Sequence, residues 1–137
     1  PKPKVDGLNF SFSGLKTSIL YKIRDYVNIN PNFINENLND LCASIQFSIV
    51  NILIEKIQKA VNKTNIKEIG IAGGVSANSF LRSSLKNIAK KNNYNIYIPK
   101  FEYCTDNAAM IGIAGYFKYL EKDFSSQSEI ATARLLF

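Results

Sequence analysis

The sequence predicts an α/β domain, and three features of the chain support this prediction. A short apolar segment at 66–72 is followed by a glycine pair and by helical periodicity over 77–91. Apolar residues then alternate over 93–99, as in a second strand, and helical periodicity recurs on both sides of this unit. A strand, a helix and a strand at this spacing form a right-handed crossover with parallel strands. We therefore expect a small, partly parallel sheet packed with helices.

The composition is that of a single folded domain over residues 1–137. Hydrophobic residues make up 46% of the chain and charged residues 20%, and no apolar run is long enough to span a bilayer. Cys42 and Cys104 lie far apart without a partner motif, which favours reduced thiols and a cytoplasmic location. The chain has no histidine, so it cannot by itself form a Ser–His or Cys–His nucleophile pair or a histidine-based zinc site.

The net charge of +6 leaves two interpretations open. The 17 Lys and Arg residues exceed the 11 Asp and Glu residues, a balance compatible with nucleic-acid binding. The same balance follows from a composition that is simply rich in Lys, Asn and Ile. On the predicted helix at 77–91, Lys86, Lys90 and Lys91 are either phosphate contacts or a solvated face.

The N-terminal third is expected to be extended first and helical next. Apolar residues alternate within 1–13, which predicts a short strand, and helical spacing follows over 14–27. Residues 28–39 are rich in Asn and contain Pro31, which is typical of a loop. The alternating residues of the predicted strand are Leu8, Phe10 and Phe12.

Two further helices are expected, a long one over 38–62 and a last one over 106–122. Apolar residues recur at helical spacing on one face of each, which predicts that these faces are buried. Residues 123–137 are expected to form a loosely packed tail. The predicted buried face of the long helix is Leu41, Ile45, Ile49 and Leu53. The predicted core-facing residues of the last helix are Met110, Ile113, Phe117 and Leu120, beside a small-residue stripe at Ala108, Gly112 and Gly115.

The glycine pair Gly73 and Gly74 follows the first predicted strand of the crossover and opens a helix. Ligands bind at that edge of open α/β sheets, and paired glycines let a flat group lie against the backbone. Asn78, in the following turn, offers a donor and an acceptor to a ribose or a nucleobase. A tight turn with Asn78 as a helix cap is an equally good interpretation of this spacing.

Asp106 lies at the predicted start of the last helix, just after the second strand of the crossover. A carboxylate there is close to the positive end of the helix dipole and stays ionised, which suits a metal ligand. Alternatively, Thr105 or Asp106 is the helix N-cap and binds nothing. One carboxylate cannot hold a metal, so other ligands would have to come from elsewhere.

A serine-rich turn surrounds Gly14 near the start of the first predicted helix. A helix start of this kind can bind an anion, although the spacing is not that of a phosphate-binding P-loop. A packing turn stabilised by serines explains the pattern as well. The polar residues concerned are Ser11, Ser13, Lys16 and Thr17.

Three motifs in order resemble the C-terminal part of the TsaD family, the tRNA adenosine threonylcarbamoyltransferases formerly described as glycoproteases. Residues 10–17 (FSFSGLKT), preceded by Pro1-Lys2-Pro3, resemble the first motif. Residues 73–78 (GGVSAN), continued by Leu81 and Arg82, resemble the family's GGVxAN motif. Residues 104–110 (CTDNAAM) resemble the third motif in its bacterial form.

The resemblance implies a fold and a set of site residues. The fold is that of the C-terminal lobe of an actin, hexokinase and Hsp70-like (ASKHA) protein, so residues 1–137 would be a portion of a larger two-lobe protein. Gly73 and Gly74 match the family's adenosine-contacting motif, and Asn78 matches the asparagine that binds the threonylcarbamoyl-adenylate. Asp106 matches a metal ligand. The metal ion, Fe²⁺ or Zn²⁺, would be completed by two histidines of an HxxxH helix that this chain lacks.

The implied activity is tRNA modification. The family transfers the threonylcarbamoyl group from threonylcarbamoyl-AMP to N6 of the adenosine 3′ of the anticodon in tRNAs that read ANN codons. The resemblance implies TsaB-like and TsaE-like protein partners, and it implies that this chain alone is inactive. Two alternatives remain: a TsaB-like interaction and dimerisation module without catalysis, or another actin-like phosphotransferase.

Overall fold

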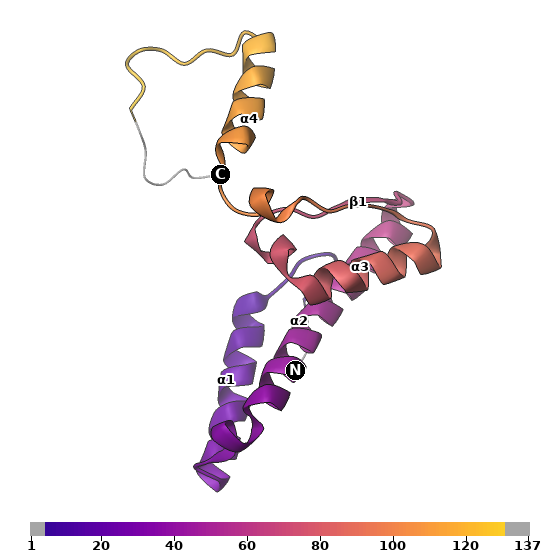
Figure 1. The fold of residues 1–137 in the computed structure, drawn as a ribbon, viewed down its shortest axis with the longest axis vertical. Helices are drawn as coiled ribbons and strands as arrows, with labels where there is room; N and C mark the ends of the chain where they lie inside the picture. Colours follow the sequence, from indigo (N-terminus) through magenta and orange to yellow (C-terminus); the bar gives the residue numbers. More distant parts are fainter. Residues whose placement is uncertain (1–4, 131–137) are drawn as a thin grey trace.

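The computed structural model describes residues 5–130, which form an elongated molecule (Figure 1). A hairpin of two long helices occupies one end, a small sheet with its helix lies in the middle, and the last helix projects from the other end. In chain order the elements are α1 (Phe12–Ile29), α2 (Phe33–Thr64), β1 (Glu68–Gly70), η1 (Gly74–Ala77), α3 (Ser79–Asn92), β2 (Asn95–Tyr97), η2 (Phe101–Tyr103) and α4 (Ala108–Leu120).

The parallel crossover predicted from the sequence is confirmed. β1 and β2 pair in parallel, with Ile69 opposite Ile96, and α3 connects them. Each strand has three residues, which is shorter than predicted. One further hydrogen bond, from Ile71 N–H to Tyr97 O at 3.1 Å, continues the pairing toward the loops at the carboxyl edge. The observed fold is therefore α/β, with a two-stranded sheet as its only sheet within residues 5–130.

The short strand predicted at the N-terminus is wrong. Phe12 begins α1 instead, because Ser11 acts as its N-cap and accepts a hydrogen bond from Gly14 N–H at 3.3 Å. The alternating aromatic residues are explained by the stacking of Phe10 on Phe12, with ring centroids 5.7 Å apart. The alternation at this position therefore reflects a capped helix start and not a strand.

The predicted loop at 28–39 is much shorter in the structure, because α2 already begins at Phe33. Asn30 accounts for the turn: its Oδ1 accepts from Asn32 N–H at 3.0 Å, and its Nδ2 donates to Glu36 at 2.8 Å. The backbone of Asn37 is non-helical and kinks α2 at this point. The Asn-rich composition therefore marks a tight turn and a kink rather than a long loop.

The core is small and lies between α2, α3 and the sheet. Val50 of α2 and Leu81 and Leu85 of α3 form its buried cluster. The predicted buried face of α2 is only half-buried, so that prediction is correct in part. The residues of this face are Leu41, Ile45, Ile49 and Leu53.

The predicted burial of α4 is wrong. Every residue of this helix is exposed, and α4 projects away from the other elements (Figure 1). The small-residue stripe also has no neighbour: a Cβ added at Gly112 or Gly115 would meet nothing within 4 Å. The apolar periodicity of α4 marks a face suited to burial, but residues 5–130 supply no surface that covers it. The four predicted core-facing residues, Met110, Ile113, Phe117 and Leu120, are 46% to 57% exposed.

The N-terminal segment is bound to α2, whereas the last described residues are exposed. Lys56 of α2 holds the N-terminal segment by donating to Val5 O at 3.1 Å and Gly7 O at 2.8 Å. Residues 123–130 are exposed. The remainder of the predicted tail, 131–137, and the Pro1-Lys2-Pro3 motif lie outside the described residues. A search of the described helices finds none with the length and apolar character needed to cross a membrane.

The exposed apolar surface predicts self-association. The solvent-accessible area is 11153 Å², whereas a folded monomer of 15.4 kDa exposes roughly 7,200 Å². Large exposed apolar patches mark surfaces that bind other proteins or aggregate. We expect the 137-residue chain to form dimers or larger species at micromolar concentrations, measured by sedimentation velocity.

Substitutions on α4 test whether this helix carries the association. We expect the double change Ile113→Lys and Phe117→Lys to weaken self-association by at least about 10-fold, because it puts two charges on the apolar face. Ile29→Lys is the matched control, since Ile29 is 83% exposed at the far end of α1. A wild-type chain that stays monomeric, or a double variant that associates like wild type, would contradict this prediction.

Candidate functional site

The candidate site lies where the loops that follow β1 and β2 reach the carboxyl edge of the sheet. Gly73 is in a left-handed backbone conformation with φ 77°, which favours glycine, and it leads directly into η1. A Cβ added at Gly74 would meet nothing within 4 Å. The backbone of this glycine pair is therefore open on its outer side.

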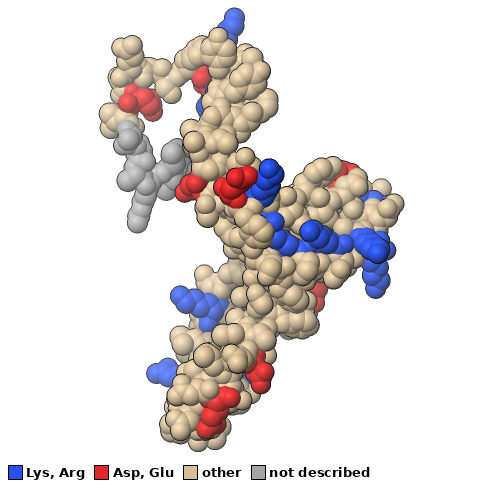
Figure 2. All heavy atoms as spheres, viewed as in Figure 1, with Lys and Arg blue, Asp and Glu red and all other residues tan. Residues whose placement is uncertain are grey.

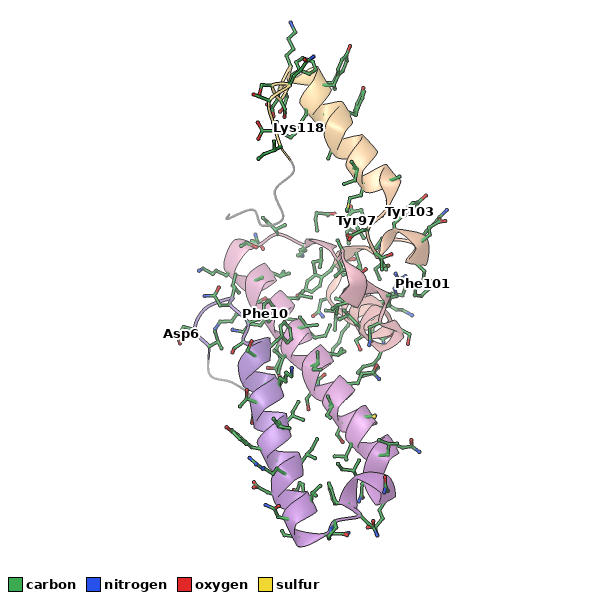
Figure 3. All side chains as sticks on the ribbon, turned by 90° about the vertical axis from the view of Figure 1, so that its left-hand side faces the viewer. Asp6, Phe10, Tyr97, Phe101, Tyr103 and Lys118 are labelled. Carbon is green, nitrogen blue, oxygen red and sulfur yellow. The ribbon has the colours of Figure 1, made fainter. Side chains whose placement is uncertain are left out.

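A hollow of about 450 Å³ joins the first loop to the second. Gly73 forms one side, Asp106 lies on the opposite loop, and the first two turns of α4 form the remaining wall. In Figure 3, Tyr97, Phe101 and Tyr103 are seen below the base of α4, and of these three Tyr103 lines the hollow. The residues that line the hollow are Ala72, Gly73, Tyr103, Cys104, Thr105, Asp106, Asn107, Ala109, Met110 and Ile113.

Asp106 is exposed in the short turn between η2 and α4. The alternative that Thr105 or Asp106 caps the helix is wrong: Asn107 is the N-cap, and its Oδ1 accepts from Met110 N–H at 3.0 Å. Asn107 also donates to Thr105 O at 2.9 Å, which closes the turn around Asp106. Within residues 5–130 the Asp106 carboxylate has no hydrogen-bond or ion-pair partner, so it is available to a ligand.

Asn78 lies elsewhere. It is the N-cap of α3, because its Oδ1 accepts from Leu81 N–H at 2.9 Å, and its Nδ2 donates to Gln46 of α2 at 3.0 Å. It lines a different hollow, of about 290 Å³, between α2 and α3. Asn78 and Asp106 therefore line different hollows in this structure. The capping interpretation of Asn78 describes its contacts.

The donor set does not fit a metal ion by itself. Among the described residues, no three His, Cys, Asp or Glu side chains lie close enough together to hold one. Asp106 contributes a single carboxylate to the hollow, and metal sites of this kind need three or four protein ligands. Residues 5–130 thus provide one ligand at most and not a complete site.

The other candidate binding residues have structural contacts or face solvent. Ser11 caps α1, and Thr17 Oγ1 donates to Ser13 O at 3.0 Å, so the serine-rich turn stabilises the helix start. Basic side chains gather over α3 in Figure 2. The lysines predicted there, Lys86, Lys90 and Lys91, are all exposed.

Arg82 continues the GGVSAN motif in the sequence, but its role in joining the two loops was not predicted. It lies in the first turn of α3, and its side chain reaches three positions in the two loops. Nε donates to Ser76 O at 2.6 Å, while Nη2 donates to Pro99 O at 2.8 Å and to Cys104 Sγ at 3.1 Å. The sequence contained one indication of this role: Arg82 lies four residues after the cap Asn78, and that spacing puts the two residues on the same face of the helix start.

Ser76 is buried at 1% exposure, and within the described residues its hydroxyl has no hydrogen-bond partner. A buried polar group without a partner costs free energy. We expect Ser76→Ala to raise the free energy of unfolding by about 1 kcal/mol, measured by urea denaturation. Ser83→Ala, at an exposed hydroxyl on α3, should stay within about 0.5 kcal/mol of wild type. A destabilised Ser76→Ala variant would mean that the hydroxyl is satisfied in solution.

These features define an α/β domain whose loops border an open hollow at the carboxyl edge of a parallel strand pair. A family model described as TsaD, tRNA N6-adenosine threonylcarbamoyltransferase, matches residues 1–113. The chain belongs to the TsaD family.

Curated relatives carry the same description. The chain is 57% identical over 137 residues to a tRNA N6-adenosine threonylcarbamoyltransferase of Christiangramia forsetii, covering 100% of this chain and 40% of that protein. Proteins with the same name from Riemerella anatipestifer and Thermosipho africanus are 54% and 44% identical, covering 97% and 95% of this chain and 39% and 38% of their own length. The chain therefore spans about 40% of the length of these relatives.

Proposed function

We propose that this chain takes part in threonylcarbamoyl transfer to tRNA, from threonylcarbamoyl-AMP to N6 of the adenosine 3′ of the anticodon in tRNAs that read ANN codons. The observation that carries the proposal is the hollow shared by Gly73 and Asp106, which belong to two of the motifs that resemble the family. The motifs, at residues 73–78 and 104–110, are separated in the sequence, and the parallel crossover brings them to one edge. In open α/β sheets, nucleotides and other ligands bind outside the carboxyl ends of the strands.

In this proposal each site residue has a separate role. The open backbone of Gly73 and Gly74 takes the adenosine of the adenylate. Asp106 supplies one oxygen ligand to a divalent metal ion, Fe²⁺ or Zn²⁺, whose other ligands come from residues outside this sequence. Asn78 binds the adenylate by exchanging its bond to Gln46 for a bond to the ligand. A contact of this kind would draw the N-terminus of α3 toward the substrate.

The proposal also covers the wider assembly. Residues 1–137 would act as the C-terminal lobe of an ASKHA-type protein, so the nucleotide would lie between this lobe and a second one. TsaB-like and TsaE-like proteins would be its partners, and a tRNA substrate would place the reaction in the cytoplasm. The exposed apolar face of α4 is consistent with a lobe that is covered by further polypeptide.

A chimera tests the proposed function. Residues 1–137 replace the aligned region of the Christiangramia forsetii relative, and the chimera is expressed in cells depleted of their own enzyme. Mass spectrometry of digested tRNA measures N6-threonylcarbamoyladenosine. We expect the chimera to restore the modified nucleoside. A folded chimera that does not restore it would contradict the proposal.

Two observations favour a second candidate function, a TsaB-like interaction module. The apolar face of α4 is uncovered and Asn78 is engaged as a cap, as expected for a chain that binds protein rather than nucleotide. The same chimera separates the two functions. An interaction module would keep partner binding and stability in the chimera, yet would form no modified nucleoside.

A further inference from the structure

Arg82 joins the two loops of the candidate site. The strand pairing ends at the bond between Ile71 N–H and Tyr97 O, before either loop reaches the hollow. Beyond that bond, within residues 5–130, the hydrogen bonds that hold the loops to a common group are those of Arg82. They reach Ser76 on the first loop and Pro99 and Cys104 on the second.

The chemistry of the guanidinium suits this arrangement. Its planar fork donates from two separate nitrogen atoms, Nε and Nη2, in fixed directions, whereas the donors of a lysine ammonium all project from one nitrogen. The guanidinium carbon also lies 4.0 Å from the centroid of the Phe101 ring, so η2 covers one face of the group. Cys104, 2% exposed, accepts from Arg82 while its own thiol donates to Lys100 O at 3.4 Å. Arg82 thereby holds the second loop at Pro99 and at Cys104.

The loop residues that Arg82 contacts are close in sequence to the proposed ligand contacts. Ser76 is three residues after Gly73, and Cys104 is two residues before Asp106. Fixing the Ser76 carbonyl and the Cys104 sulfur against one side chain fixes the separation of Gly73 and Asp106 across the hollow. Arg82 does not line the hollow itself, so it acts through the loops and not by touching a ligand.

We propose that Arg82 is a positioning residue that sets the separation of the adenosine loop and the Asp106 loop, so that an adenylate contacts both together. This inference rests on the proposed function, because it takes the hollow as the adenylate site. Removing the guanidinium should let each loop move independently. An adenylate would then meet one loop at a time.

NMR titration of the ¹⁵N-labelled 137-residue chain with AMP tests the proposal. In wild type we expect the amide signals of Gly73, Gly74 and Asp106 to shift together with one midpoint. In Arg82→Met the two loops should respond separately, so the Asp106 signal no longer follows that of Gly73. The AMP concentration at the midpoint should rise at least 10-fold for both signals. Arg82→Lys should show the same separation in weaker form, and it serves as the second variant if the Met change unfolds the chain. Arg24→Met, at an exposed arginine of α1, should behave like wild type.

A purely structural role would predict something different. It would lower thermal stability in Arg82→Met but leave both loops shifting with one midpoint, and that result would overturn the proposal. A lysine variant that is indistinguishable from wild type would also overturn it.

A second measurement separates this proposal from the proposed function. Amide hydrogen exchange without ligand should accelerate at least 10-fold at Ser76, Asn78 and Cys104 in Arg82→Met and not in Arg24→Met. If AMP shifts no signal in wild type while exchange accelerates as expected, the adenylate assignment of the hollow fails and the joining of the loops stands. Unchanged exchange at these amides would overturn the role of Arg82.

Discussion

Asp106→Ala in the chimera is expected to reduce tRNA modification by at least about 10–100-fold, the loss typical even of outer-shell partners of a metal ligand. The carboxylate has no partner within residues 5–130 and lines the hollow beside Gly73, so its removal breaks no internal bond. In the proposed function, the same change removes a metal ligand. The measurement is N6-threonylcarbamoyladenosine per tRNA, by mass spectrometry.

The fold should survive this substitution. Because Asn107 caps α4, the loss of Asp106 leaves the helix start intact, and the thermal midpoint should change little. Asp40→Ala, at an exposed carboxylate of α2, is the matched control and should leave modification unchanged. Full activity of the Asp106→Ala chimera would remove Asp106 from the proposed site.

Leu85→Ala is expected to have the largest effect on stability. Leu85 is 0% exposed and forms, with Val50 and Leu81, the buried cluster between α2 and α3. Truncation of such a leucine costs about 2–5 kcal/mol, because transfer free energy is lost and a cavity remains. For a chain with so small a core, this is a large part of the about 5–15 kcal/mol that holds a typical domain folded.

Urea denaturation followed by circular dichroism measures this loss. We expect the midpoint of Leu85→Ala to fall sharply or the variant to be unfolded in buffer. Leu20→Ala is the control, since Leu20 is 60% exposed on α1 and should change stability by no more than about 0.5 kcal/mol. A loss below about 1 kcal/mol for Leu85→Ala would mean that the cluster is not the stabilising core.

The crossover was predictable because its signals are local. Alternation at Ile96 and Ile98, the glycine pair after the first strand and the helical spacing between them each specify backbone conformation within a few residues. The handedness and the parallel pairing follow from that order by a general rule. Both site loops therefore appear at the predicted edge of the sheet.

The N-terminal strand and the burial of α4 were not predictable in this way. Alternation at Phe10 and Phe12 is also produced by two stacked rings next to a helix cap, and period alone does not separate the two cases. The periodicity of α4 identifies an apolar face, yet it carries no information about which surface covers it. A partner surface is a long-range property, and no surface among the described residues covers Phe117.

The site was predictable only as a set of positions. The sequence placed Asn78 after one strand and Asp106 after the other. The direction of each side chain, however, depends on contacts with residues that are distant in the sequence. Asn78 turns toward α2 because Gln46 accepts its Nδ2. Arg82 was not predicted as a site residue because its three acceptors come from loop positions far apart in the chain.

The exposure of α4 has a thermodynamic consequence for the hollow beside Asp106. The first turns of α4 supply one wall of that hollow through Ala109, Met110 and Ile113, while the outer face of the helix is open to solvent. Any polypeptide that packs on α4 therefore also fixes the wall that a ligand would touch. Binding at the two surfaces is linked, and each ligand changes the affinity of the other by the same factor.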